Sequence, residues 1–301
     1  MLSVEQLRGI LPAIPTPVHA DDTVHAEAVR ALLRYLLRQG VDGLVPLGGT
    51  GEYGALSRAE RARMAALTVE EAGGSVPVIA GVLDPGYHDA MQAGREFAAA
   101  GVDGLLVLTP YYTNPTQAGI RDYFMRYADE SPVPILIYEI PYRTRIAIAP
   151  EVLHELSRHE RILGMKACNT DMWHFLRTVA GVDERFAVLS GEDTLFPLHV
   201  TAGARGGIVV TASLLPTAWQ SVYQLASTGR AQEALALHRS LIPLMELAFA
   251  ETNPGPMKSV MDLIGVEAPG MLAPLVPAAP ELTARLRAEL SRQLETFEAL
   301  R

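Results

Sequence analysis

The chain has twenty-five basic residues, of which only two, Lys166 and Lys258, are lysines. Lys166 lies within an apolar run, residues 161–168, that is typical of a buried strand. Arginine is not deprotonated in proteins, whereas a desolvated lysine can lose its proton and become a nucleophilic amine. Lys166 is therefore a candidate for Schiff-base catalysis. The alternative is a structural lysine whose stem packs in the core while its ammonium group reaches water.

Three tyrosines follow apolar runs and could serve such an amine. Tyr138 lies near the end of the run at 134–140, and Tyr111 and Tyr112 follow the run at 104–109. A phenol beside a neutral amine can transfer protons while a carbinolamine forms and collapses. Aromatic side chains at strand ends also serve as core or rim packing. The choice between these roles depends on where the strands meet.

The turn at 48–54 has the sequence Gly-Gly-Thr-Gly-Glu-Tyr-Gly. Its backbone N–H groups and the hydroxyl of Thr50 suit a carboxylate or phosphate, although a plain tight turn is equally compatible. The glycines also satisfy the G-x-G-x-x-G pattern, which would favour a dinucleotide-dependent oxidoreductase. That pattern follows the second predicted strand instead of the first, and the acids at the expected offset, Glu70 and Glu71, fall within a helix pattern and not at the end of the next strand. We therefore favour a substrate-binding turn at Gly49 and Thr50.

Other polar residues give weaker indications. Arg143 lies on the loop after Tyr138 and could bind a carboxylate through two parallel hydrogen bonds, although a surface arginine fits equally well. The eight histidines show no metal-ligand spacing with nearby acids, so no metal is expected. The single cysteine, Cys168, suits a small buried side chain and excludes an internal disulfide. The segment 191–193 is expected to cap the helix that follows it.

The hydrophobic pattern predicts the scaffold that gathers these residues. Short apolar runs alternate with longer amphipathic stretches; the runs are 10–15, 43–47, 76–82, 104–109, 134–140, 162–167, 186–190 and 207–211. About eight such units predict an α/β fold, a single TIM (β/α)8 barrel with its chemistry at the carboxyl ends of the strands. After residue 226 the pattern becomes helical, at 232–249, 257–264 and 281–300. We predict a barrel with the active site over 1–226 and a C-terminal helical cap over 227–301.

Composition limits the partners that such a barrel could have. The 301 residues, 49% hydrophobic and 20% charged, describe an ordinary folded protein. The net charge of −9 argues against nucleic acid or an anionic membrane as the main partner, but a local positive site could still bind a small anion. We see no membrane span and no secretory signal, so we expect a cytoplasmic protein.

Together the motifs resemble those of the dihydrodipicolinate synthase/N-acetylneuraminate lyase family of class I, pyruvate-handling aldolases. The resemblance covers nearly the whole chain, through the order of motifs at 16–17, 48–52, 109–112, 138–141, 164–166, 190–193, 206–211 and 253–258. It implies that Lys166 forms a Schiff base with the ketone of a 2-oxo acid, with no cofactor besides this covalent imine. It also implies that Tyr138 transfers protons and that the turn at Gly49 and Thr50 holds the carboxylate of the 2-oxo acid.

The resemblance extends to the quaternary structure and reveals two departures. Tyr112 would match the tyrosine that reaches into a neighbouring subunit's site in a homotetramer, and Ile208 would match the position whose carbonyl faces the pyruvoyl pocket.

Gly49 stands where synthases usually carry a hydroxyl residue that links two tyrosines in a proton relay. Glu139 replaces the common asparagine after the catalytic tyrosine. Arg143 falls where dihydrodipicolinate synthases bind the carboxylate of aspartate semialdehyde.

We therefore expect a dihydrodipicolinate synthase-like condensation of pyruvate with an aldehyde such as aspartate semialdehyde. A 2-keto-3-deoxy sugar acid aldolase or dehydratase is the main alternative, and an oxidoreductase or a non-catalytic oxo-acid sensor is a remote one. The expected partners are small-molecule 2-oxo acids and aldehydes. The chemistry predicts that burial lowers the pKa of Lys166 from ~10.4 to about 7–8, which makes more of the amine neutral.

Overall fold

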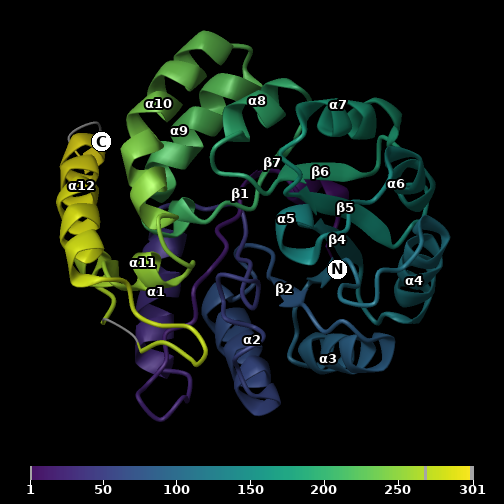
Figure 1. Ribbon diagram of the computed structural model, residues 1–301, viewed down its shortest axis with the longest axis horizontal. Coiled ribbons are helices and arrows are strands. Elements are labelled where there is room, and N and C mark those ends of the chain that lie inside the picture. Colours follow the sequence, from purple (N-terminus) through teal and green to yellow (C-terminus); the bar gives the residue numbers. More distant parts are fainter. Residues whose placement is uncertain (1, 268–269, 299–301) are drawn as a thin grey trace.

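The computed structural model describes residues 2–267 and 270–298. Its core is a curved sheet of seven parallel strands in the order β1-β7-β6-β5-β4-β3-β2 (Figure 1). The strands are β1 (Gly9–Ile10), β2 (Ile79–Val82), β3 (Gly104–Leu108), β4 (Ile135–Glu139), β5 (Ile162–Ala167), β6 (Ala187–Ser190) and β7 (Gly206–Gly207). All of these residues are buried except Leu163, which is half-buried, as expected for strands covered on both faces.

Residues 43–47 fill the eighth position and close the sheet. Val45 forms a parallel bridge to Ala13, and Leu44 forms one to Val78 on the other side. The predicted strand at 43–47 is thus held by two isolated bridges instead of a regular ladder, because Pro46 has no N–H group to donate. The closure confirms the predicted (β/α)8 barrel.

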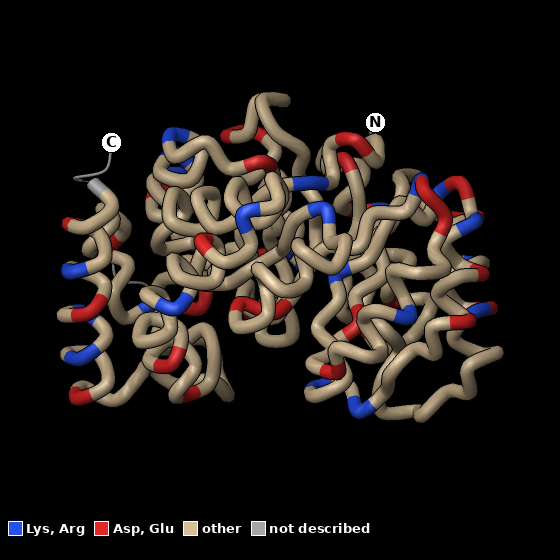
Figure 2. The backbone as a smooth tube through the Cα atoms, turned by 90° about the horizontal axis from the view of Figure 1, so that it is seen from above, with Lys and Arg blue, Asp and Glu red and all other residues tan. Residues whose placement is uncertain are grey.

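The helices form an outer layer around the sheet (Figure 1). They are α1 (Ala26–Arg38), α2 (Arg58–Ala72), α3 (Tyr87–Ala99), α4 (Gln117–Glu130), α6 (Pro150–Leu156), α7 (Met172–Gly181), α8 (Phe196–Thr201) and α9 (Pro216–Ser227), with the short α5 (Pro141–Thr144) on the loop after β4. Ser57 caps α2 by accepting from the N–H of Glu60, and Gly73 ends that helix in the left-handed conformation. Figure 2 shows basic and acidic residues mixed along the outer helices.

The helix start at Arg58 bears on the glycine motif at 49–54. In a dinucleotide-binding fold the last glycine of the motif lies at the opening of a helix, where the helix dipole meets the pyrophosphate. Here the chain turns from residue 49 to residue 56, and α2 begins only after Ser57. The motif is therefore a wide turn at the mouth of the barrel.

Beyond residue 230 the described part of the chain forms further helices, as the sequence predicted. It forms α10 (Ala231–Ala248), α11 (Gly255–Lys258), the 3-10 helix η3 (Met261–Ile264) and α12 (Pro280–Glu298). Helix α10 packs against α8 and α9 on one side and α12 on the other. The last two residues of the helix predicted at 281–300 lie outside the described residues. Within the described residues, no helix combines the length and the apolar character needed to cross a membrane.

A buried ion pair fastens this C-terminal segment to the turn after the second strand position. Lys258 of α11 pairs with Glu52, and its Nζ donates to the carbonyl of Thr16 over 2.8 Å. The second carboxylate oxygen of Glu52 accepts from the N–H of Leu272 at 2.9 Å. Both charged side chains are essentially inaccessible to solvent. Lys258 is thus held at the barrel mouth.

Replacing Lys258 by methionine tests the importance of this pair. The variant leaves the Glu52 carboxylate buried and unpaired, so we expect the free energy of unfolding to fall by about 3–5 kcal/mol in denaturant titrations. Lys258→Met combined with Glu52→Gln should recover part of that loss. As a matched control, Arg287→Met breaks the exposed pair with Asp262 and should cost at most about 1 kcal/mol. Equal losses at the two sites would contradict the prediction.

Candidate active site

A cavity of about 300 Å³ opens at the carboxyl ends of the strands. Five of the residues singled out from the sequence line it: Gly49, Thr50, Tyr138, Arg143 and Lys166. They come from two different connections and from two strands, so only closure of the barrel brings them together. This is the mouth at which chemistry is expected in such a fold.

The centre of the cavity is the pair formed by Lys166 and Tyr138. The parallel register of β4 and β5 makes these two residues direct neighbours. The Lys166 Nζ lies 4.7 Å from the centre of the Tyr138 ring, and both side chains are buried, at 6% and 4% exposure. A methyl group at Gly191 would lie 2.9 Å from Cγ of Lys166, so the glycine there leaves space for the lysine stem.

The electrostatics of Lys166 differ from the sequence expectation. Burial is the largest influence and lowers the pKa of the amine, as predicted, but Tyr138, Cys168, Asp193 and Glu192 all raise it. The net result is a pKa above the ordinary value for lysine, so the prediction of 7–8 is wrong for the ligand-free site. The reason is that the amine is buried together with acidic groups, which sequence spacing did not reveal.

The acidic groups around Lys166 do not contribute equally at neutral pH. Burial raises the pKa of Tyr138 and of the Cys168 thiol, so both are uncharged near pH 7. Burial and then the charge of Asp193 raise the pKa of Glu192 to about 7. The negative charge facing Lys166 therefore comes from carboxylates, and part of it titrates in the physiological range.

The turn at 49–52 is held from several sides. The Thr16 hydroxyl donates to the carbonyl of Gly51 at 2.8 Å, and the Asn253 amide donates to the Thr50 hydroxyl oxygen at 2.8 Å. A side chain at Gly51 would press on the backbone of Leu47, at 2.8 Å from its nitrogen. At Gly49 the nearest atom to an added Cβ is Nη1 of Arg143, at 4.0 Å. The absence of a hydroxyl residue at position 49 is therefore not forced by crowding.

Two of the predicted site residues lie outside the cavity lining. The side chain of Tyr112 is 90% exposed, on a residue with φ of 72°. Ile208 is fully buried, and its N–H donates to the carbonyl of Ser190 at 2.8 Å. The roles predicted for both residues stay predictions.

Several lining residues were not predicted as site residues: Tyr142, Glu192, Asp193, Phe249 and Asn253. Glu192 and Asp193 were expected to cap a helix. Asp193 instead accepts from the backbone N–H groups of Val210 and Thr211, at 2.9 and 2.8 Å, and so links β6 to the connection after β7. The position of Glu192 and Asp193 directly after a strand end could have indicated that they belong to the site. Phe249 and Asn253 follow α10, outside the strand pattern on which the prediction rested.

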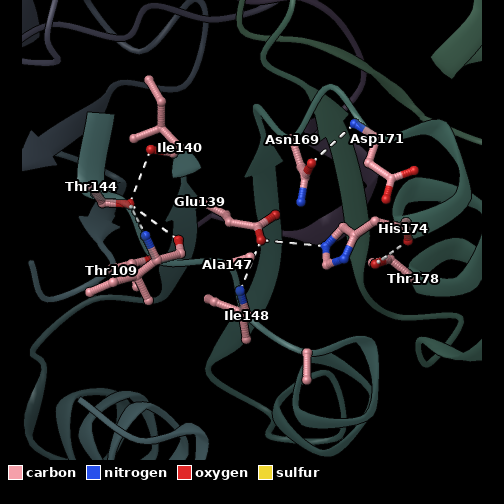
Figure 3. A network of polar contacts seen from close by, with 12 residues as sticks. Thr109, Glu139, Ile140, Thr144, Ala147, Ile148, Asn169, Asp171, His174 and Thr178 are labelled. Atoms are coloured by element: carbon pink, nitrogen blue, oxygen red, sulfur yellow. Dashed lines mark hydrogen bonds and ion pairs between the residues drawn. The ribbon is translucent and has the colours of Figure 1, made fainter. Parts of the chain in front are cut away.

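Glu139, the second departure from the family pattern, lies behind Tyr138. Adjacent strand residues face opposite sides of a sheet, so Glu139 points away from the cavity toward the helices. Its Oε1 accepts from the N–H of Ile148 at 3.0 Å and lies 3.4 Å from Nε2 of His174 on α7 (Figure 3). The Glu139 carboxylate thus fixes the segment that carries Arg143 against β4 and α7. Within the described residues its Oε2 has no partner.

Comparison with known proteins agrees with this geometry. The dihydrodipicolinate synthetase family matches residues 6–293. The 4-hydroxy-tetrahydrodipicolinate synthase of Methanospirillum hungatei is 34% identical over 287 residues, 94% of this chain and 98% of the relative. The enzyme of the same name from Acidiphilium cryptum is 35% identical over 283 residues, 94% and 97% of the two chains.

Solved structures give the same result. The crystal structure of dihydrodipicolinate synthase from Aquifex aeolicus matches with a TM-score of 0.91 and 31% identity, covering 96% of this chain and 98% of that chain. The 4-hydroxy-tetrahydrodipicolinate synthase of Methylacidiphilum fumariolicum matches with a TM-score of 0.91 and 31% identity, covering 97% of each. Fold, site and relatives together define an enzyme of the class I aldolase type, a Schiff-base lyase. Within that class, the chain belongs to the dihydrodipicolinate synthetase family.

The pairing of Glu139 with His174 predicts a pH-dependent term in stability. Glu139 is the main cause of a pKa of His174 above its ordinary value, with a smaller contribution from Asp171. A group whose folded pKa is raised stabilises fully below its unfolded pKa of ~6.5 and loses this effect as pH rises through the folded value. Replacing His174 by glutamine should therefore destabilise the protein more at pH 6 than at pH 9 in denaturant titrations.

The exposed His88 offers the control for that experiment. His88→Gln should keep the pH dependence of the wild-type protein. A His174→Gln variant whose deficit is the same at both pH values would show that the ion pair does not form.

Glu192 gives a second pH prediction. Because its charge raises the pKa of Lys166, Glu192→Gln should lower that pKa and increase the neutral fraction of the amine. Imine formation with pyruvate should then be faster near neutral pH, and the acidic limb of its pH–rate profile should move to lower pH, measured by stopping the reaction with borohydride. The exposed Glu160→Gln serves as control. An unshifted limb in Glu192→Gln would refute the prediction.

Proposed function

We propose that the protein joins pyruvate to an aldehyde through an imine at Lys166, as a 4-hydroxy-tetrahydrodipicolinate synthase with aspartate semialdehyde as the aldehyde. The observation that carries the proposal is the buried contact between Lys166 and Tyr138, in one cavity with the turn at Gly49 and Thr50 and with Arg143. The names of the relatives support the same activity. The reaction needs no cofactor besides the covalent imine.

The arrangement supports the following steps. The neutral fraction of Lys166 attacks the ketone carbon of pyruvate, and the carbinolamine hydroxyl leaves as water with a proton from the phenol of Tyr138. The phenol suits this role because its raised pKa keeps it protonated. The protonated imine then draws electrons from C3, so that transfer of a C3 proton to the Tyr138 phenolate gives an enamine. The enamine carbon attacks the aldehyde carbon and forms the new carbon–carbon bond, and the aldehyde oxygen takes up that proton. Hydrolysis of the regenerated imine by water then releases the product and the free amine.

The carboxylates of the two substrates are assigned to neighbouring parts of the cavity wall. The backbone N–H groups and hydroxyl of the turn at Gly49 and Thr50 bind the carboxylate of pyruvate. Arg143, whose Nη1 lies 4.0 Å from the Cβ position at Gly49, binds the carboxylate of the aldehyde. Asp193 accepts hydrogen bonds from two backbone N–H groups and from the Thr211 hydroxyl, which hold its carboxylate in the cavity wall.

A second candidate is cleavage or dehydration of a 2-keto-3-deoxy sugar acid. Gly49 favours it, since the hydroxyl that would complete a tyrosine relay is absent although a side chain would fit there. Glu192 could also accept hydrogen bonds from sugar hydroxyls, because its buried Oε1 has no partner within the described residues. The same imine at Lys166 would serve either reaction.

The assembly and location of the enzyme complete the proposal. We infer a cytoplasmic homotetramer in which the exposed Tyr112 enters the cavity of a neighbouring subunit. One similar solved structure is that of a monomeric dihydrodipicolinate synthase variant.

Trapping the imine tests the proposed function. Incubation with pyruvate and borohydride should add one reduced pyruvoyl group to a peptide that contains Lys166. Lys258 is the matched internal control, since it is the other lysine of the chain and is buried in an ion pair. Lys166→Arg should abolish both the adduct and turnover. A folded protein without an adduct at Lys166 would refute the proposal.

A product assay then separates the two candidates. Pyruvate with aspartate semialdehyde should give the condensation product, and Arg143→Ala should raise the KM for the aldehyde without a comparable change in the KM for pyruvate. Activity confined to a panel of 2-keto-3-deoxy sugar acids would favour the second candidate instead.

A further inference from the structure

The hydroxyl of Thr50 receives a hydrogen bond from a residue far away in the chain. The Nδ2 group of Asn253 donates to its Oγ1 at 2.8 Å. Both residues are buried, at 4% and 8% exposure, and both line the cavity that contains Lys166. The contact therefore lies in the wall of the cavity that contains Lys166.

The direction of this hydrogen bond has a consequence for Thr50. A hydroxyl has one proton to donate and two lone pairs that accept. Because Asn253 fills one accepting position, the Thr50 proton must point elsewhere. Within residues 2–267 and 270–298, no protein acceptor receives it. The proton is available to an anion in the cavity.

Asn253 is well placed to impose this direction. The N–H of Gly255 donates to the carbonyl of Thr252 at 2.9 Å, and α11 begins immediately after Pro254. At the end of α11, Lys258 pairs with Glu52, two residues beyond Thr50. The segment that carries Asn253 and the turn that carries Thr50 are thus joined at two points, which fixes their relative position.

The other end of the Asn253 amide is also informative. Its Oδ1 is buried and has no hydrogen-bond partner within the described part of the chain. A reversed amide would direct an oxygen at Thr50 and take up the hydroxyl proton. In the observed orientation the Asn253 Nδ2 group donates to Thr50 and the Asn253 Oδ1 atom is left without a partner. A buried acceptor without a hydrogen bond costs free energy, so this orientation needs a benefit elsewhere, which a Thr50 proton free to bind an anion would supply.

We propose that Asn253 is a positioning residue that directs the proton of the Thr50 hydroxyl toward the carboxylate of the bound 2-oxo acid. The inference rests on the proposed function and deepens it, since it adds a residue of the C-terminal segment to the recognition of the 2-oxo acid. Asn253 acts through Thr50, so its effect on binding should vanish when the Thr50 hydroxyl is removed.

A double-mutant cycle in the full-length protein tests this dependence. The variants are Asn253→Leu, which has a similar size but no donor, Thr50→Val, which has no hydroxyl, and their combination. The readout is the pyruvate concentration that gives half-maximal borohydride-trapped adduct at Lys166, which needs no aldehyde. Each single variant should raise this concentration about tenfold or more, as for a hydrogen bond to a charged group, and the double variant should be no worse than Thr50→Val.

Asn253→Asp provides the polarity test. Its carboxylate can only accept, so it takes the Thr50 proton away from pyruvate. We expect a larger loss of pyruvate affinity than for Asn253→Leu in the wild-type background. In the Thr50→Val background the difference between the aspartate and leucine variants should shrink, whereas simple charge repulsion by the aspartate would leave it unchanged. Thermal unfolding of each variant shows whether the fold is intact.

The outcomes separate this inference from the proposed function. An adduct in the wild-type protein together with a non-additive cycle supports the inference. An adduct with additive losses, or an unchanged aspartate–leucine difference in both backgrounds, overturns the inference and leaves the proposed function standing. No adduct in the folded wild-type protein overturns both.

Discussion

The parallel register of β4 and β5 is the constraint on which the site depends. It sets Tyr138 beside Lys166 at the end of two buried strands, so that neither side chain needs a flexible loop to reach the other. The contact between Lys166 and Tyr138 sets two further structural requirements. The lysine stem needs space, which Gly191 leaves, and the segment beyond β4 needs fixing, which Glu139 provides from the opposite face of the same strand. Rigid strands hold catalytic groups in register more accurately than loops do.

The immediate surroundings of the amine set its protonation. Burial alone would favour the neutral amine, but Tyr138, Cys168, Asp193 and Glu192 favour the charged ammonium form, and the pKa of Lys166 is raised. At rest the amine is therefore mainly protonated. Since the pKa of Glu192 lies at about 7, this balance is set by a group that itself titrates near neutral pH.

Much of this could be predicted from the sequence. Period and length of the apolar runs predicted the barrel, because strands buried on both faces leave a strong signal, and the rarity of lysine pointed to Lys166. Contacts between distant segments could not be predicted in this way. Asn253 meets Thr50 across more than two hundred residues, and Asp193 binds the backbone of Val210 instead of capping a helix. The predicted direction of the Lys166 pKa shift was wrong in part for the same reason, since three of the groups that raise this pKa, Tyr138, Asp193 and Glu192, come close to Lys166 only in the folded chain.

The ion pair between α11 and the turn at the barrel mouth has a consequence for folding during synthesis of the chain. Ribosomes deliver the strands first, and the lysine and the phenol could already stand side by side in a nascent chain. The ion pair of Lys258 and Glu52 can form only after the segment that carries Lys258 has been synthesised. A polypeptide shorter than that would have Lys166 and Tyr138 but would lack the ion pair that holds the turn at 49–52 in place.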